Sequence, residues 1–500
     1  MKIKQSITLF FILIFFILFQ TELCAQNRTS FPRIAPDPKA LEYYNFGVPN
    51  GSYSWIDLAE ISLWASGTAG NNSSAINRIT SAVNALNNSA DFPSSGKERA
   101  EYILNYMHRN ILRTYSLYQT RIDTIFTQGS FNCVSSAVLY MILCESAGIS
   151  TSGVITREHA FVMVHIDGQD IDVETTNRYG FDPGNRREFH DQFGRVTGFT
   201  YVPAQNYRDR QSISKIEMIS LILNNRIADL ERRNNFADAV PLALDRAALL
   251  LGDSFAAIGE SAYSGHLFSD PRKDLMDRLF NYAGTLLRAN REEDGINWAL
   301  SASSVYPEND RWNDYLHAAV NNRITRFLRE LRITEARNFL ENNKTIITNE
   351  NYAGFDTAII ETDLLNRAGR INSAANAEAV ISAVRQAREE NRLPEKRANE
   401  LIIFAVQKTA SVFGAARDWR SAIGYLENAV IRFGPNRELE QSLGVYISNL
   451  AADYHNRFAA EWNRRNYSEA QRILIEGLEE FPDNRQLLSD KEIVDRHNSR

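Results

Sequence analysis

The feature that most limits how this chain can fold is a pattern that occurs twice near its C-terminus. Each copy has an aromatic residue, two small residues around a leucine at helical spacing, and a Phe-x2-Asn stop. The two copies are Trp419-x2-Ala422-x3-Leu426-x2-Ala429-x3-Phe433-x2-Asn436 and Tyr467-x2-Ala470-x3-Leu474-x2-Gly477-x3-Phe481-x2-Asn484. Small residues let two helices approach closely, so the pattern predicts helix pairs that each bury a neighbour's apolar face. We expect this all-α helical-repeat domain over residues 211–500.

Weaker copies of the pattern precede these two. They are Gly295, Ala299, Ala302, Tyr306 and Asn309, and then Phe236-x2-Ala239-x3-Ala243. The pattern resembles tetratricopeptide repeats, mainly in the second helix of each unit, with a spacing longer than the usual ~34 residues. The resemblance implies a concave surface that binds a protein partner. The alternative is an irregular helical domain with some amphipathic similarity.

Residues 129–202 differ in character from the rest of the chain. A helical segment there is followed by short β-patterned runs at Gly153-Thr156, His159-Ile166, Gln169-Glu174 and Gly198-Val202. Helical patterns precede it from Leu41 to Tyr118. We therefore expect an α+β domain over residues 41–210, in which a cysteine helix packs on a small antiparallel sheet.

Cys133 and Cys144 lie in one predicted helix, eleven residues apart. Their axial separation of roughly 16 Å exceeds the ~7 Å limit for a disulfide, so both should be free thiols. Cys133 is placed in the first turn, where the helix dipole favours a thiolate. Cys144 is interpreted as a packed small hydrophobe at the edge of one buried face, formed by Val134, Ala137, Val138, Met141 and Ile142.

Asp167-Gly168 separates two alternating runs and predicts a two-residue hairpin. The expected pairs are Ile166 with Gln169, Met163 with Asp172, and Phe161 with Glu174.

This register selects an acid for His159. Asp172 and Glu174 are both expected on the face of His159, but Glu174 lies one diagonal step away and Asp172 two residues further. Asn177 is a third candidate, which the register places on the other face. Glu174 is therefore the expected partner, which would orient the imidazole and stabilise the imidazolium.

Three motifs in order resemble the transglutaminase-like superfamily, whose site is papain-like. They are Asn132-Cys133 opening a helix, His159-Ala-Phe-Val opening a strand, and Val173-Glu174-Thr-Thr-Asn177 after a hairpin. The resemblance covers roughly residues 95–205 and implies Cys133 as nucleophile, His159 as base and Glu174 as orienting acid. Glu174-Thr175 stands where Asp-Pro is commoner in that family.

An oxyanion hole is expected to use the backbone N–H of Cys133. Gln128 is a candidate for a second donor, because papain relatives use a glutamine shortly before the cysteine. The alternative for Gln128 is a loop side chain in solvent.

The N-terminus is interpreted as a signal peptide over residues 1–25. Lys2 and Lys4 precede the apolar run Ile7–Phe19, whose thirteen residues fall short of the roughly 20 that cross a membrane. We expect cleavage before Gln26, a flexible lead-in over 26–40, no membrane span after cleavage, and a periplasmic or extracellular protein. Lipid attachment at Cys24 is less favoured, because Thr21-Glu22-Leu23 is a poor lipobox.

Composition limits the partners. The chain is 44% hydrophobic and 23% charged, with a formal net charge of −6 and no long basic run, which argues against a nucleic-acid partner. No cofactor and no metal are expected, because nucleotide loops, flavin signatures and metal-ligand spacing are absent from the sequence. His165 and His190 are interpreted as surface or satisfied histidines.

These observations predict an exported cysteine enzyme that forms a thioester acyl-enzyme from an amide or peptide bond. Water as acceptor makes it a peptidase or amidase, and an amine makes it an acyl transferase. The substrate is expected to be a protein or peptide, with the helical repeats binding protein. The alternative is a non-catalytic repeat scaffold whose transglutaminase-like domain is an interaction module.

Overall fold

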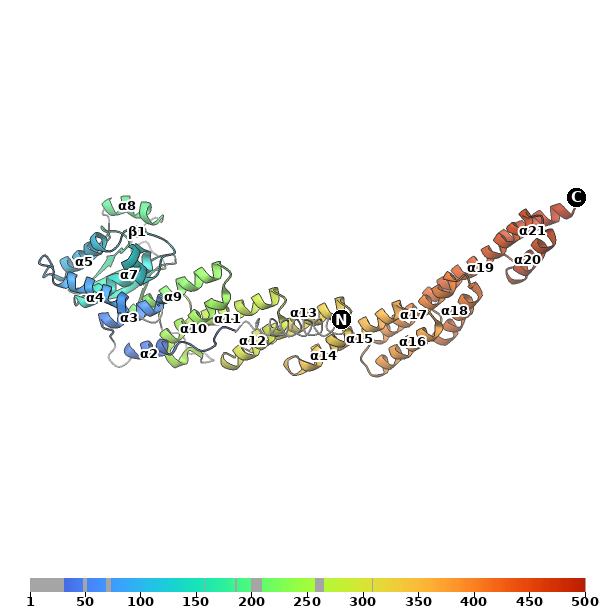
Figure 1. Ribbon diagram of the computed structural model, residues 1–500, viewed down its shortest axis with the longest axis horizontal. Coiled ribbons are helices and arrows are strands. Elements are labelled where there is room, and N and C mark those ends of the chain that lie inside the picture. Colours follow the sequence, from blue (N-terminus) through green and yellow to red (C-terminus); the bar gives the residue numbers. More distant parts are fainter. Residues whose placement is uncertain are drawn as a thin grey trace, which may run out of the picture. The chain divides into compact units, whose positions relative to one another are not determined.

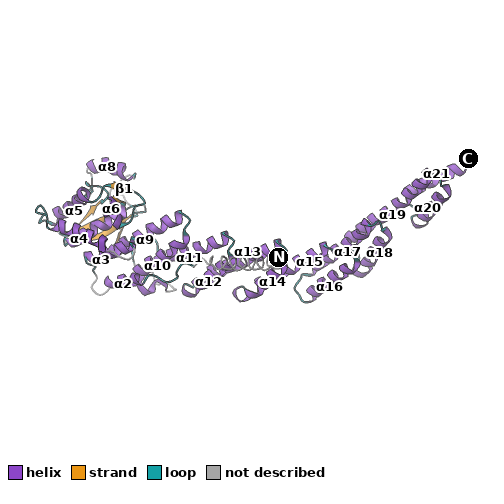
Figure 2. Ribbon diagram, in the orientation of Figure 1, coloured by secondary structure: helices purple, strands orange, loops and turns teal. Residues whose placement is uncertain are grey.

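The computed structural model describes residues 31–47, 52–68, 73–157, 159–184, 187–198, 209–256, 265–307 and 309–499. The predicted signal peptide lies outside these residues, as does the predicted strand at 198–202 apart from Gly198. The chain divides into two compact units, one up to Trp312 and one from Asn313. It is mostly helical with a small antiparallel sheet before residue 214, which confirms the coarse α+β prediction (Figures 1 and 2).

The main sheet has the strand order β5-β4-β3-β6, and all of its neighbouring strands are antiparallel. Its strands are β3 (Ser150–Ile155), β4 (Ala160–Ile166), β5 (Gln169–Val173) and β6 (Gln211–Ile213).

The predicted register of the β4–β5 hairpin is confirmed for its first pairs. Ile166 pairs with Gln169 and Met163 with Asp172, and Asp167 and Gly168 both have positive φ, as this kind of turn requires. The predicted pair of Phe161 with Glu174 is not formed, because β5 ends at Val173. The Glu174 N–H instead donates to the Gly180 carbonyl at 2.7 Å.

Helix α7 (Cys133–Ser146) is the centre of the first unit. It contacts β3 and β4, together with α3 (Trp55–Ala65), α5 (Gly96–Asn110) and α9 (Lys215–Arg232). Every residue from Val134 to Cys144 is buried, so the prediction of a single buried face was wrong. A helix that is covered by other elements on all sides is apolar all round.

The other elements of this unit are mostly helices. They are α2 (Pro38–Gly47), α4 (Ser73–Asn87), α6 (Ile122–Gln128), α8 (Arg187–Thr197), α10 (Phe236–Leu251), the 3₁₀ turn η2 (Gly252–Ala256), α11 (Pro271–Arg288) and α12 (Glu292–Val305). Two short strands, β1 (Thr114–Tyr115) and β2 (Ser130–Phe131), pair in parallel and bring Tyr115 beside Phe131. This pairing places Tyr115 next to the segment that leads into Cys133.

The second unit is helical throughout its described residues. Its elements are α13 (Asn309–Arg329), which begins just before the boundary, α14 (Ile333–Asn342), η3 (Lys344–Ile346), α15 (Asn349–Gly369), α16 (Ala374–Glu389), α17 (Glu395–Ala415), α18 (Trp419–Phe433), α19 (Arg437–Asn463), α20 (Tyr467–Glu480) and α21 (Arg485–Asn498). Among the described residues, no helix combines the length and the apolar character needed to cross a membrane.

The repeated sequence pattern falls on α18 and α20. Its small residues and leucines are buried, namely Ala422, Leu426, Ala429, Ala470, Leu474 and Gly477. The asparagine at the end of each copy caps the next helix: Asn436 Oδ1 accepts from the N–H of Leu439, and Asn484 Oδ1 from that of Leu487. The stop signal of one helix is thus the start signal of the next.

One turn geometry recurs between consecutive helices: α9–α10, α11–α12, α13–α14, α16–α17, α17–α18 and α19–α20. Its middle residue has a φ between 55° and 64° in Asn234, Asn290, Leu331, Asn391, Arg417 and Arg465. The next residue's N–H donates to the carbonyl five residues earlier at 2.8–3.0 Å. The same helix–turn–helix geometry therefore repeats along the chain, and its first two instances lie in the first unit.

Candidate active site

Helix α7 begins at Cys133 because Asn132 caps it. Asn132 Oδ1 accepts from the Ser135 N–H at 2.9 Å, and the Asn132 N–H donates to Ser135 Oγ at 2.9 Å. This reciprocal capping fixes Cys133 in the first turn, where the backbone N–H groups have no partner inside the helix. Cys133 is half-buried and Cys144 is fully buried, and both are free thiols.

The structure brings the three residues of the predicted triad together. His159 Nε2 lies 2.6 Å from Glu174 Oε2, and the imidazole also interacts with the Cys133 side chain. Burial lowers the pKa of His159. The charge of Glu174 and hydrogen bonds with Cys133 and Glu174 outweigh burial and hold that pKa well above its ordinary value. The site therefore favours an imidazolium beside the thiol.

The two other candidate acids have different partners. Asp172 forms an ion pair with Arg210, whose guanidinium contacts both carboxylate oxygens. Asn177 Oδ1 accepts from the N–H of Tyr179 at 2.9 Å and so stabilises its own turn. Glu174 is the acid that the structure places beside the imidazole.

Glu174 is held by buried contacts on the segment that follows β5. Its Oε1 accepts from Thr176 Oγ1 at 2.7 Å and from the Thr176 N–H at 3.2 Å. Thr175 Oγ1 lies 2.9 Å from Ser136 Oγ on α7, and His108 Nε2 lies 3.0 Å from the Thr175 carbonyl oxygen. These contacts fix the acid relative to the cysteine helix.

His108 makes this arrangement sensitive to acid. Burial lowers its pKa to about 4, although the hydrogen bond to the Thr175 carbonyl opposes the shift. The unfolded-state pKa is near ~6.5, so between these values the unfolded chain binds more protons than the folded chain. The stability that neutral His108 provides is complete above pH ~6.5 and is lost as the pH falls towards 4.

We therefore expect the free energy of unfolding, measured in urea, to fall as the pH is lowered from ~6.5 to ~4. His108 should account for up to about 3 kcal/mol of this fall. The variant His108→Gln keeps a donor for Thr175 and should lose this part of the pH dependence. Equal pH slopes for the two proteins would contradict the assignment.

Aromatic side chains surround the imidazole of His159. The ring of Phe161 stacks at a centroid distance of 6.3 Å, and Phe193 of α8 meets it edge-on at 5.6 Å. Phe193 is itself buried against Phe189. The His159 side chain is consequently only 7% exposed.

Tyr115 is a site residue that the sequence did not reveal. Its hydroxyl is buried and has no hydrogen-bond partner among the described residues. Burial raises the pKa of Tyr115, and the charges of Cys133 and Glu174 raise it further. The phenol therefore stays protonated and offers a donor near the site. A two-residue strand gives no periodic signal that could have indicated this placement.

Gln128, His165 and His190 are the other polar residues that the sequence analysis considered. Gln128 is the exposed last residue of α6, five residues before Cys133. His165 is satisfied by Asp170 at 2.7 Å and Ser152 at 3.0 Å, while the side chain of His190 lies outside what is described. The described residues contain no group of three or more His, Cys, Asp or Glu suited to a metal.

Comparisons with known proteins do not assign the chain to a family. No protein-family model and no curated protein matches the chain. Among solved structures, the chain is similar to menin, in a crystal structure that reveals the binding site for Mixed Lineage Leukemia (MLL) protein. Identity is 12%, the match covers 85% of this chain and 93% of that chain, and the TM-score is 0.32. This TM-score is too low to indicate a shared fold.

Proposed function

We propose that the protein is an exported enzyme of the transglutaminase-like type that cleaves or transfers amide bonds through Cys133. The observation that carries the proposal is the position of His159, which contacts Glu174 at 2.6 Å and also interacts with the Cys133 side chain. The motifs around these residues support the family assignment. The export component rests on the sequence of residues 1–25.

The chemistry follows from the three side chains. The Cys133 thiolate attacks the acyl carbon, the C–N bond breaks, and the His159 imidazolium gives its proton to the leaving amine. A thioester remains on Cys133. His159 then takes a proton from water as it attacks, which releases a carboxylic acid and restores the thiolate. An amine in place of water gives a new amide, while Glu174 holds the imidazole in the productive tautomer.

Two donors are available for the oxyanion of the tetrahedral intermediate. The Cys133 N–H lies in the first turn of α7, where helix N–H groups have no partner inside the helix. The buried Tyr115 hydroxyl is the second donor, and its lack of a partner among the described residues favours it over the exposed Gln128. The helix pairs support binding of a protein or peptide substrate.

One observation favours a second candidate function. Phe161 and Phe193 leave the His159 side chain only 7% exposed, as expected of a non-catalytic interaction module whose triad is packed away. The reactivity of the Cys133 thiol distinguishes the two functions, because the enzyme needs a reactive Cys133 and the scaffold does not.

The pH dependence of iodoacetamide labelling tests the enzyme. We expect Cys133 to label well below pH ~8, and labelling to slow at least about tenfold in His159→Ala. Cys133→Ser measures any labelling of Cys144, whose pKa burial raises well above its ordinary value.

The matched control is His165→Ala, which removes a histidine from β4, the strand that directly follows His159. It should label like the wild type. A Cys133 that does not react in the folded protein, or that reacts like an ordinary thiol regardless of His159, would overturn the enzyme in favour of the scaffold.

A further inference from the structure

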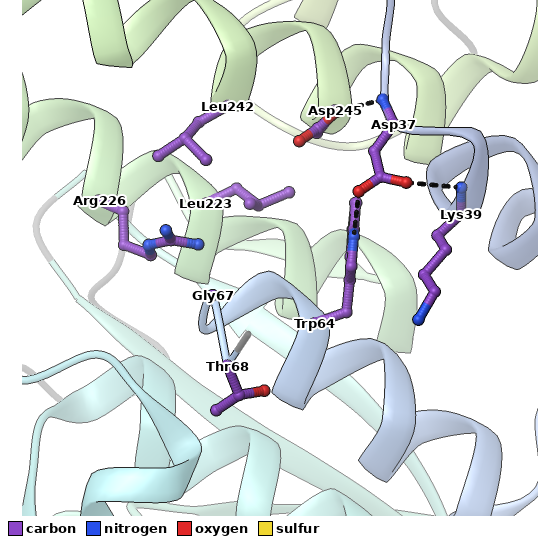
Figure 3. Close-up of a pocket in the computed structure, with 9 residues that line it drawn as sticks. All are labelled: Asp37, Lys39, Trp64, Gly67, Thr68, Leu223, Arg226, Leu242 and Asp245. Atoms are coloured by element: carbon purple, nitrogen blue, oxygen red, sulfur yellow. Dashed lines mark hydrogen bonds between the residues drawn. The ribbon is translucent and has the colours of Figure 1, made fainter. Parts of the chain in front are cut away.

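A cavity of about 280 Å³ lies between α2, α3, α9 and α10 of the first unit (Figure 3). None of the residues that line it belongs to the Cys133 site. We propose that this cavity binds a small organic carboxylate with a compact apolar body, and that Arg226 holds the carboxylate. This site goes beyond the proposed function and does not depend on it.

Arg226 carries the proposal. Its guanidinium points into the space between Leu223 and Gly67 (Figure 3). It also donates a hydrogen bond to the Ala65 carbonyl. Burial is the main influence that lowers the pKa of Arg226, and the positive charge of Arg121 lowers it further. A guanidinium nevertheless stays charged in a protein. Asp245 and Asp123 act on it only at longer range, and it has no ion pair among the described residues. A desolvated cation without an adjacent anion favours binding of one.

The carboxylates in the cavity wall are already engaged. Asp245 Oδ1 and Oδ2 accept from Arg33 Nη2 at 2.7 and 2.6 Å, and Oδ1 also accepts from the Asp37 N–H. Asp37 Oδ1 accepts from the Lys39 N–H at 3.0 Å, and its Oδ2 from Trp64 Nε1 at 3.4 Å. Their positions are thus fixed by other partners, and the charge of Arg226 is left for a ligand.

The position of the guanidinium depends on a glycine. Gly67 follows α3 with a φ of 75°, and a Cβ there would lie 2.5 Å from Arg226 Nη2. A larger residue would compete with the guanidinium for this space. The hydrogen bond to the Ala65 carbonyl orients the cation before any ligand arrives, which lowers the entropic cost of binding.

The rest of the cavity determines the shape of the ligand. Trp64, Leu223 and Leu242 supply apolar walls opposite and beside the guanidinium (Figure 3). The volume corresponds to roughly nine water molecules at about 30 Å³ each. A carboxylate can pair with the guanidinium through two parallel N–H···O bonds while its apolar part packs on these walls.

The test compares 3-phenylpropionate with its neutral isostere 3-phenylpropionamide, titrated into the full chain by calorimetry. We expect the acid to bind in the millimolar range or tighter, and the amide at least about tenfold more weakly. Arg226→Gln should remove the preference for the acid and Arg226→Lys should keep part of it. Leu242→Trp, which fills the cavity and leaves Arg226 unchanged, should abolish binding.

Several results would overturn the site. They are equal binding of acid and amide, no binding of the acid up to about 20 mM, or unchanged binding in Leu242→Trp. Inorganic phosphate that binds as tightly as the acid would exclude the apolar component. If Arg226→Gln does not fold, the comparison of acid with amide in the wild type and the binding to Leu242→Trp still test the site. Labelling of Cys133 is a separate measurement, so failure here leaves the proposed enzyme untouched.

Discussion

Replacing Glu174 with glutamine is expected to slow iodoacetamide labelling of Cys133 at neutral pH by about two orders of magnitude. Burial lowers the pKa of His159, and the charge of Glu174 is the largest influence that opposes it. Without that charge the imidazole loses its proton at a lower pH, and the thiolate loses its counter-ion. The measurement is the labelling rate as a function of pH.

The substitution should also change how stability depends on pH. A folded-state pKa raised above the unfolded value of ~6.5 contributes stability that is complete below that value. This stability is lost as the pH rises through the folded pKa. Glu174→Gln should therefore destabilise the protein most on the acidic side of neutrality.

Asp172→Asn is the matched control, because it neutralises a carboxylate on the same hairpin whose partner is Arg210. It should change the labelling rate by less than about threefold. Glu174→Asp keeps the charge on a shorter side chain and should fall between wild type and Glu174→Gln. Wild-type labelling in Glu174→Gln, or equal slowing in Asp172→Asn, would show that Glu174 is not the acid.

Gly180→Ala is expected to destabilise the protein by about 4 kcal/mol or more. A Cβ at Gly180 would lie 1.9 Å from the Glu174 carbonyl oxygen and 2.9 Å from that of Asn177. These are backbone atoms of a segment that two hydrogen bonds hold together. The Glu174 N–H donates to the Gly180 carbonyl at 2.7 Å, and the Gly180 N–H donates to the Asn177 carbonyl at 3.0 Å. The segment must open to admit the methyl group, and Glu174 moves with it. Urea unfolding and Cys133 labelling measure the two consequences.

Gly168→Ala provides the comparison for this substitution. Gly168 has a φ of 74°, and a Cβ there would meet nothing within 4 Å. Gly168→Ala should lower the free energy of unfolding by about 1 kcal/mol, because only the left-handed backbone disfavours alanine there. The labelling rate of Cys133 should not change. Equal stability of the two variants would refute the steric explanation for Gly180.

The parts of the fold that were predictable have strong local signals. Asp167-Gly168 admits a tight hairpin, so the pairing of Met163 with Asp172 followed from counting. The apolar run that begins at Val134 predicted a helix with Cys133 in its first turn, and α7 begins at Cys133. These signals were enough to bring His159 and Glu174 onto neighbouring positions, even though Glu174 lies just beyond the sheet.

The parts that were not predictable depend on tertiary packing. Val134 to Cys144 is apolar enough to be buried on every side, but the sequence of α7 does not show how many elements cover it. Strands β1, β2 and β6 have two or three residues, too few for an alternating pattern. Tyr115 and His108 therefore reach the site through contacts that no local spacing encodes.

The recurrent turn with positive φ separates two kinds of connection between consecutive helices. At this turn the chain passes from helix to helix through one residue of fixed geometry, such as Asn290 between α11 and α12 or Asn391 between α16 and α17. The other connections differ in length, from the segment after α10 to the short link between α18 and α19. Peptide tags and grafted loops are thus best inserted at connections without this turn, because the hydrogen bond to the carbonyl five residues earlier fixes the length of the turn.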